Sequence, residues 1–81
     1  MAKLSAGKRR AAIARIVEAR FSLSLFEEMK RKDPRSWKSK ANDMCRGIYA
    51  QAILERRRLQ GVPDDELRAE SAAISRGAAA R

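Results

Sequence analysis

Residues that interrupt helices are rare in this sequence. Its 81 residues include four glycines and two prolines, whereas the strong helix formers alanine, arginine, lysine, glutamate and leucine are abundant. Hydrophobic residues make up 44% of the chain, but 15 of them are alanines, so little large apolar surface is available for a core. We therefore expect one small basic all-α domain over residues 1–81. It should be a small bundle of three to four helices with a long central helix, and with mobile ends at about 1–6 and 77–81.

The clearest helix is predicted at about Pro34 to Gln60. Asp33 can cap its free amides, and proline suits the first helical position, where a missing N–H costs nothing. Gly61 fits the left-handed residue that commonly follows a helix, and Pro63 prevents continuation. Helical spacing predicts one buried apolar face, made of Trp37, Ala41, Met44, Cys45, Ile48, Ala52 and Leu59, with Tyr49 and Ile53 at its edge.

Glu55 interrupts this apolar face between Ala52 and Leu59. A frayed, solvated last turn explains it more simply than a buried contact with a partner's base, and we favour the first explanation. The face is long, about 33 Å from Trp37 to Leu59 at 1.5 Å per residue, and short flanking helices should leave part of it uncovered. Ile53, Glu55 and Leu59 are therefore the candidates for a partner-binding or homodimer surface.

A first helix is predicted from about Ser5 or Ala6, with Ile13, Ile16 and Val17 on one face. A kink or break near Ser22 to Ser24 is favoured over continuation to about Arg31. Ser24 and Glu27 have the spacing of a capping box, which would start a new helix. We expect the apolar residues of this region to pack against Trp37 to Ile48 as the densest part of the core: Phe21, Leu23, Leu25, Phe26 and Met29.

The last helix is predicted to begin after Pro63, with three acidic residues in its first turn, where negative charge complements the helix dipole. Its apolar face of Leu67, Ser71 and Ile74 is weak, so the helix should be short. The junction at Gly61 does not match a DNA-reading helix-turn-helix, because charged residues replace the small and apolar ones that this motif needs. A second turn of this kind, at about residues 32–35, is also not favoured because the following helix is long.

Several classes of enzyme are excluded by composition. The chain has no histidine, so it lacks a Ser-His or Cys-His nucleophile pair and a histidine-containing zinc site. The single cysteine, Cys45, cannot form an internal disulfide, and we expect it to be a small core residue. No catalytic residue, cofactor or metal is predicted. With a single cysteine, nothing indicates an oxidising compartment, so we expect a cytoplasmic location. No apolar run approaches the roughly 18 residues of a membrane span, so we expect no membrane partner.

Positive charge dominates the surface chemistry. Nineteen lysines and arginines face ten acidic residues, which gives a net charge of +9. The cluster Arg56 to Arg58 is explained in part by the negative end of its helix, whereas Lys8 to Arg10 lie at the positive end of theirs. Such clusters bind phosphates through charge-assisted hydrogen bonds and counterion release. The candidate nucleic-acid-binding residues are Lys8, Arg9, Arg10, Arg15, Lys38, Lys40, Arg56, Arg57 and Arg58.

The aromatic residues lie on predicted core faces, so a stacking platform for single strands is not evident. We interpret the chain as a non-enzymatic nucleic-acid-binding or regulatory protein that contacts the phosphate backbone of duplex DNA or structured RNA. The alternative is a small protein-binding inhibitor or adaptor of phage or mobile-element type. Its partner would be an acidic or nucleic-acid-bearing complex, as for an anti-CRISPR-like inhibitor of a host nucleoprotein. This alternative is an analogy from size and charge, without a motif.

Overall fold

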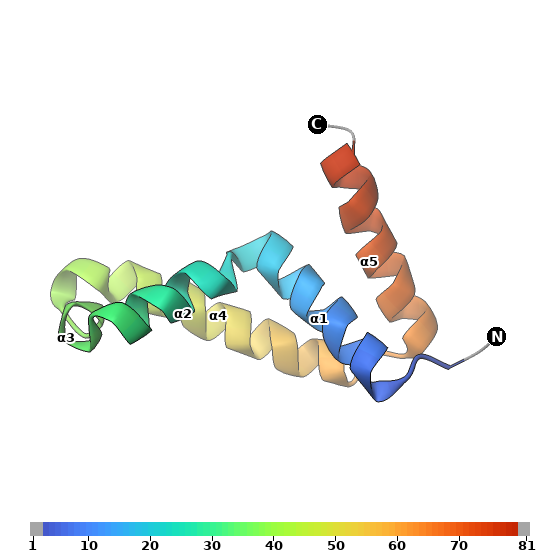
Figure 1. Ribbon diagram of the computed structural model, residues 1–81, viewed down its shortest axis with the longest axis horizontal. Helices are drawn as coiled ribbons and strands as arrows, with labels where there is room; N and C mark the ends of the chain where they lie inside the picture. The colour runs from blue at the N-terminus through green and yellow to red at the C-terminus, as the bar shows by residue number, and fades with distance from the viewer. Residues whose placement is uncertain (1–2, 80–81) are drawn as a thin grey trace.

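The computed structural model describes residues 3–79, and all regular structure in that range is helical. The elements in chain order are α1 (Ala6–Phe21), α2 (Leu23–Lys32), α3 (Pro34–Trp37), the 3-10 helix η1 (Lys40–Asn42), α4 (Asp43–Gln60) and α5 (Asp64–Ala79). Figure 1 shows α1 and α2 following one another along α4, which runs back beside them. The segment α3–η1 makes the turn at one end, and α5 leaves the other end at a steep angle to α4. The prediction of a small all-α fold with one long helix is confirmed.

The predicted break after the first helix is confirmed at Ser22. This residue has left-handed backbone angles, φ 53° and ψ 46°, and its N–H donates to the carbonyl of Glu18 at 2.9 Å. The predicted capping box is wrong, because Glu27 does not cap the new helix. Instead the Glu18 carboxylate accepts from the backbone N–H of Ser24 at 2.9 Å and from its hydroxyl. The last turn of α1 thereby caps the first turn of α2.

The predicted helix start at Pro34 is confirmed, but the continuous helix from there to Gln60 is wrong. The Asp33 carboxylate accepts from the N–H of Ser36 at 3.1 Å, as a capping residue should. The helix nevertheless ends at Trp37. Arg46 of α4 reaches back and donates to the carbonyls of Trp37 and Ser39, both at 2.6 Å. These long-range hydrogen bonds stabilise a turn that local helix propensity does not predict.

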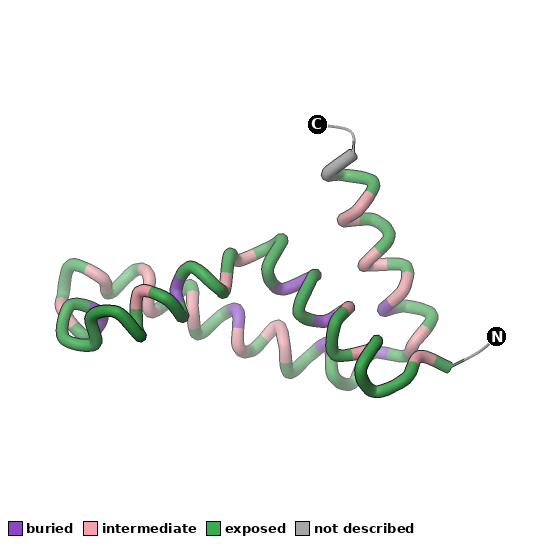
Figure 2. The backbone as a smooth tube through the Cα atoms, viewed as in Figure 1, coloured by how far each residue is buried: buried purple, intermediate pink, exposed green. Residues whose placement is uncertain are grey.

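The main core lies where α1, α4 and α5 meet (Figure 2). Its buried residues are Ile13, Ile16, Val17, Ala52, Leu59, Val62 and Leu67. The predicted cluster of Ile13, Ile16 and Val17 is thus confirmed. The expectation that the densest packing involves Phe21 to Met29 and Trp37 to Ile48 is wrong.

A smaller aromatic cluster holds the far end together. Phe26 and Trp37 are buried there, with ring centroids 6.2 Å apart, and Tyr49 meets Trp37 edge-on at 5.6 Å. The fully buried face predicted for residues 37–59 is wrong, because Met44 is 79% exposed and Ile48 39% exposed. Met44 and Ile48 lie on α4 together with the buried Ala52 and Leu59, but they belong to the first half of that helix, outside the main core that α4 forms with α1 and α5.

The last helix begins at Asp64 with acidic residues in its first turn, as predicted. Its 16 residues contradict the expectation of a short helix, and Leu67 is fully buried. Gly61 has φ −94° and ψ −1°, so the predicted left-handed geometry is wrong. The predicted mobile ends fall partly on residues 1–2 and 80–81, which lie outside the described residues, whereas Ala6 and Gly77 are helical. None of the helices within residues 3–79 has the length and hydropathy needed to cross a membrane.

Candidate functional site

Arg9 is part of the fold. Its guanidinium pairs with the carboxylate of Asp64 at the start of α5, and it donates to the carbonyls of Gln60 at 3.0 Å and Val62 at 2.7 Å. The hydrogen bond from Arg9, supported by one from the N–H of Leu4 at 3.0 Å, holds the pKa of Asp64 below its usual value. Arg9 therefore caps the end of α4 and joins it to α5.

Four charged side chains form a second network on three helices. Arg58 of α4 donates to Glu55 of the same helix and to Glu70 of α5, the latter at 3.1 Å. Arg20 of α1 lies 3.4 Å from Glu70 and 3.9 Å from Glu55. The side chain of Glu55 is 19% exposed, and its helix continues to Gln60, so the predicted frayed last turn is wrong. The Glu55 carboxylate is therefore paired with Arg20 and Arg58 of its own chain and does not need a base from a partner.

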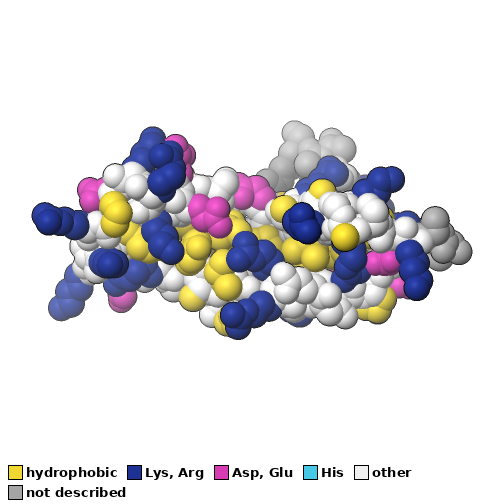
Figure 3. All heavy atoms as spheres, turned by 60° about the horizontal axis from the view of Figure 1, so that its bottom comes forward, with side chains coloured by type: hydrophobic (Ala, Val, Ile, Leu, Met, Phe, Trp, Pro, Cys, Tyr) yellow, Lys and Arg dark blue, Asp and Glu magenta, His cyan; other side chains and the backbone are white. Residues whose placement is uncertain are grey.

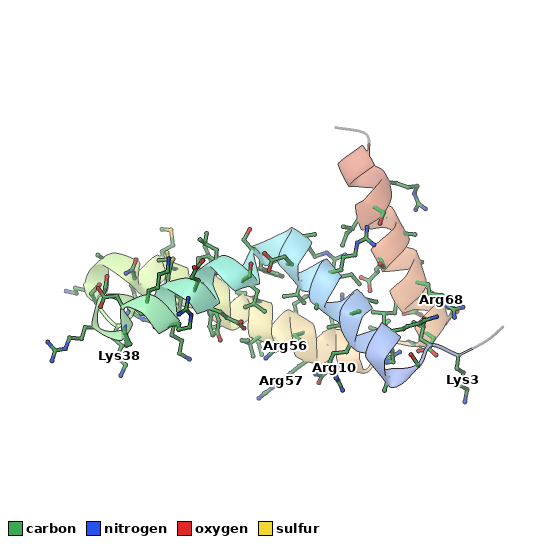
Figure 4. All side chains as sticks on the ribbon, in the orientation of Figure 1. Lys3, Arg10, Lys38, Arg56, Arg57 and Arg68 are labelled. Carbon is green, nitrogen blue, oxygen red and sulfur yellow. The ribbon has the colours of Figure 1, made fainter. Side chains whose placement is uncertain are left out.

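A different group of arginines forms no ion pair with any acidic residue in the described part of the chain. Figure 4 shows Arg10 of α1 and Arg56 and Arg57 of α4 on the same side of the helices. Among the described residues, no carboxylate forms an ion pair with any of these three. Residues 46 positions apart in the sequence come together here because α4 runs back beside α1. We call Arg10, Arg56 and Arg57 the arginine cluster.

A groove runs between the helices on this side. Figure 3 shows a band of apolar side chains along the molecule with lysine and arginine side chains on both sides of it. Part of the groove is a pocket of about 300 Å³ between α1, the start of α2 and α4. Arg10 and Arg56 line it together with Ile13, Val17 and Leu23. The arginine cluster thus borders an apolar hollow.

The other predicted basic residues lie elsewhere. Lys8 and Arg15 are exposed on α1, and Arg15 donates to the hydroxyl of Ser75. Lys38 and Lys40 are exposed in the turn at the opposite end of the molecule, where Figure 4 labels Lys38. Of the nine predicted nucleic-acid-binding residues, the structure brings three into the arginine cluster and gives Arg9, Arg15 and Arg58 partners within the chain.

The predicted partner-binding residues do not form one exposed surface. Leu59 is fully buried in the main core, so its side chain is not available to a partner. Glu55 belongs to the charged network, and Ile53 is half-buried. Large exposed hydrophobic side chains occur instead at Leu25, Met44, Ile48 and Leu54.

Four polar residues line the pocket besides Arg10 and Arg56, and none of the four was predicted as a site residue. Glu18, Ser24 and Glu27 come from the α1–α2 junction, and Gln60 from the end of α4. These residues come together only through the antiparallel placement of α1 beside α4. Periodicity within one helix does not reveal that placement, so the sequence carries no signal for them.

The described part of the chain contains no group of three or more histidine, cysteine, aspartate or glutamate side chains that could hold a metal ion. Cys45 is a half-buried free thiol. No protein-family model matches this chain, and comparisons with curated proteins and with solved structures found no significant match.

Proposed function

We propose that this protein is a non-enzymatic nucleic-acid-binding protein that contacts phosphate groups through the arginine cluster. One observation carries the proposal: within residues 3–79, Arg10, Arg56 and Arg57 share a face and form no ion pair, whereas Arg9, Arg20 and Arg58 are paired on the side of α5. Guanidinium groups without internal partners are free to make bidentate hydrogen bonds to phosphate oxygens. The net charge of +9 adds long-range attraction to a polyanion.

Backbone contact is a better fit than stacking on single strands. The rings of Phe26, Trp37 and Tyr49 pack against one another at centroid distances of 5.6 and 6.2 Å, and the first two side chains are buried. The exposed side of Tyr49 is approached by the ammonium of Lys30, 5.7 Å from the ring centroid. Phe21, the remaining aromatic residue, packs partly buried against the main core. The four aromatic residues therefore offer no row of exposed faces to successive bases in the described part of the chain, so we assign the affinity to phosphate contacts.

A matched pair of triple variants tests this proposal. The first replaces Arg10, Arg56 and Arg57 with glutamine, and the second replaces Arg35, Lys38 and Lys40 with glutamine at the other end of the molecule. Both remove three positive charges. Fluorescence anisotropy with duplex DNA and with structured RNA should show a much larger loss of affinity for the first variant. Equal losses would show that net charge alone drives binding, and no binding by the unmodified protein would overturn the proposal.

A second candidate function is supported by the exposed hydrophobic side chains. Leu25 of α2 is 54% exposed, and Met44 and Ile48 of α4 are exposed one helical turn apart. Large apolar side chains near one another on a surface are typical of protein interfaces. A protein-binding adaptor or inhibitor would lose its partner, or its self-association, when Met44 and Ile48 are replaced by lysine. Chemical crosslinking and sizing chromatography at several concentrations would show whether these substitutions change complex formation.

A further inference from the structure

The pocket beside the arginine cluster has chemically different ends. Arg10 and Gln60 lie toward the end of α4, with Arg56 one turn earlier on that helix. Glu18 and Glu27 belong to the other end, where α1 meets α2. Arg10 and Glu18 are eight residues apart on one helix, which corresponds to about 12 Å along its axis. A ligand filling the pocket would therefore meet Arg10 at one end, Arg56 between the ends and the two carboxylates at the other end.

The walls between these ends are apolar. They are formed by Ile13, Ala14 and Val17 of α1 and by Leu23 of α2. Ala14 is exposed and Leu23 is half-buried, so these two are accessible to a ligand. The volume of about 300 Å³ is at the lower end of the range for small-molecule sites. A flat ring held between aliphatic side chains suits such a space better than a flexible chain does.

The carboxylates restrict the class of ligand further. Glu18 already accepts two hydrogen bonds from Ser24, which hold its pKa below the usual value and keep it ionised. Glu27 is exposed, and among the described residues no hydrogen bond or ion pair occupies its carboxylate. A fatty acid or other simple amphipathic anion would leave these charges facing its apolar end. A ligand with N–H donors at the end opposite its anionic group would satisfy Glu27.

These features match a single nucleotide, and we infer that the pocket receives the base of an unpaired nucleotide in a bound nucleic acid. The phosphate lies at Arg10 and Arg56. The base lies against Ala14 and Leu23, which are the accessible apolar lining residues, and its amino group donates to Glu27. This inference rests on the proposed function and specifies the substrate: a duplex with a bulged, flipped or terminal unpaired nucleotide. A paired base keeps both faces stacked in the duplex, whereas an unpaired base enters a side pocket at a much smaller cost.

The same geometry predicts which bases are preferred. Cytosine, adenine and guanine carry an exocyclic amino group, and a glutamate accepts from the amino group of cytosine in known protein contacts with bases. Thymine and uracil present a carbonyl oxygen at the corresponding position, which a carboxylate repels. The preference should therefore be for a bulged cytosine over a bulged thymine.

The test uses the full chain and three DNA duplexes that differ at one position: fully paired, with a single bulged cytosine, and with a single bulged thymine. We expect about tenfold tighter binding of the cytosine bulge than of the paired duplex, and weaker binding of the thymine bulge. The variant Glu27→Gln should lose the preference for cytosine over thymine and keep the affinity for paired DNA. A bulged 2-aminopurine should change its fluorescence on binding because its environment becomes apolar.

A pocket-filling variant separates this inference from the proposed function. Ala14→Leu fills the pocket without changing charge, and Ala11→Leu is its control at an exposed position of α1 outside the pocket. Ala14→Leu should abolish the preference for the bulge, whereas Ala11→Leu should keep it.

Equal affinity of the unmodified protein for all three duplexes would overturn the inference and leave phosphate binding intact. Binding of free deoxycytidine monophosphate as tightly as the bulged duplex would also overturn it, because the ligand would then be a free nucleotide. Failure to bind any duplex would instead overturn the proposed function.

Discussion

The guanidinium of Arg9 and the carboxylate of Asp64 join the end of one helix to the beginning of the next. Arg9 pairs with Asp64 and also donates to backbone carbonyls of Gln60 and Val62. One side chain of α1 thereby fixes the connection between α4 and α5. Charge alone would assign the whole Lys8 to Arg10 cluster to ligand binding. Arg9, however, stabilises the fold.

Replacing Arg9 with alanine should therefore destabilise the protein, whereas replacing its neighbour Arg10 should not. Loss of the hydrogen bonds to the backbone carbonyls at this half-exposed site should cost about 1–2 kcal/mol of unfolding free energy. Urea denaturation followed by circular dichroism measures the difference. Arg10→Ala is the matched control, since Arg10 makes no ion pair within the described residues. Equal midpoints for the two variants would contradict the structural role of Arg9.

Acid should destabilise the fold through Asp64 and Glu18. Both have a pKa below the usual value, Asp64 mainly because of Arg9 and Glu18 mainly because of the hydroxyl of Ser24. A folded-state pKa below that of the unfolded chain gives a contribution that is complete above about pH 4.5 and is lost as the pH falls through the folded value. Thermal unfolding between pH 2 and 7 should show this loss. In Asp64→Asn the loss should be smaller, and parallel pH profiles for the two proteins would exclude Asp64 as a source.

A substitution at Ser22 should stabilise the protein, because the backbone of this residue is left-handed. A residue with a side chain is strained at φ 53°, whereas glycine adopts this conformation without a steric cost. Ser22→Gly should raise the unfolding free energy by up to about 1 kcal/mol. Ala19→Gly, at an exposed right-handed position of α1, should lower it by about 1 kcal/mol. A loss of stability in Ser22→Gly would indicate that the serine side chain itself is needed at the break.

The last helix should prove to be part of the cooperative core. Leu67 is fully buried between α1, α4 and α5, so Leu67→Ala should cost about 2–5 kcal/mol. Ile74 is only partly buried against the same core, and Ile74→Ala should cost less. Hydrogen exchange of α5 amides would report whether this helix unfolds with the rest of the protein. Exchange of these amides far faster than in α1 would show that α5 is peripheral.

The predicted and observed helices differ for identifiable reasons. The helix start at Pro34 and the apolar face of Ile13, Ile16 and Val17 follow from local patterns, and the sequence was sufficient for them. The break near Ser22 was predicted at the right place, but from a capping box that does not form; Glu18 caps the new helix instead. The turn after Trp37 depends on hydrogen bonds from Arg46, nine residues away. The predicted buried face of the central helix was wrong for another reason: Met44 and Ile48 share α4 with the buried Ala52, but the main core that α1 and α5 form with α4 does not include them.

In the candidate site, too, some features could be predicted from the sequence and others depend on contacts between distant residues. Composition identified a surplus of arginine, and two of its clusters were evident in the sequence. Which members point to solvent depends on where the acids lie in three dimensions: Asp64 neutralises Arg9, and Glu70 approaches Arg58 at 3.1 Å. Proximity of Arg10 to Arg56 requires the antiparallel placement of α1 and α4. Local sequence patterns carry no information on that placement.

Salt dependence distinguishes direct phosphate contact from general attraction. Each phosphate neutralised by a basic side chain contributes about −0.9 to the slope of log affinity against log salt concentration for duplex DNA. Removing Arg10, Arg56 and Arg57 together should therefore make the slope less steep by about 3 if each contacts one phosphate. The variant of Arg35, Lys38 and Lys40 has the same net charge as the variant of the arginine cluster, so both lose long-range attraction to DNA equally. The salt slope of the Arg35, Lys38 and Lys40 variant should nevertheless stay close to that of the unmodified protein. Identical slopes for the two variants would mean that the arginine cluster does not touch the backbone.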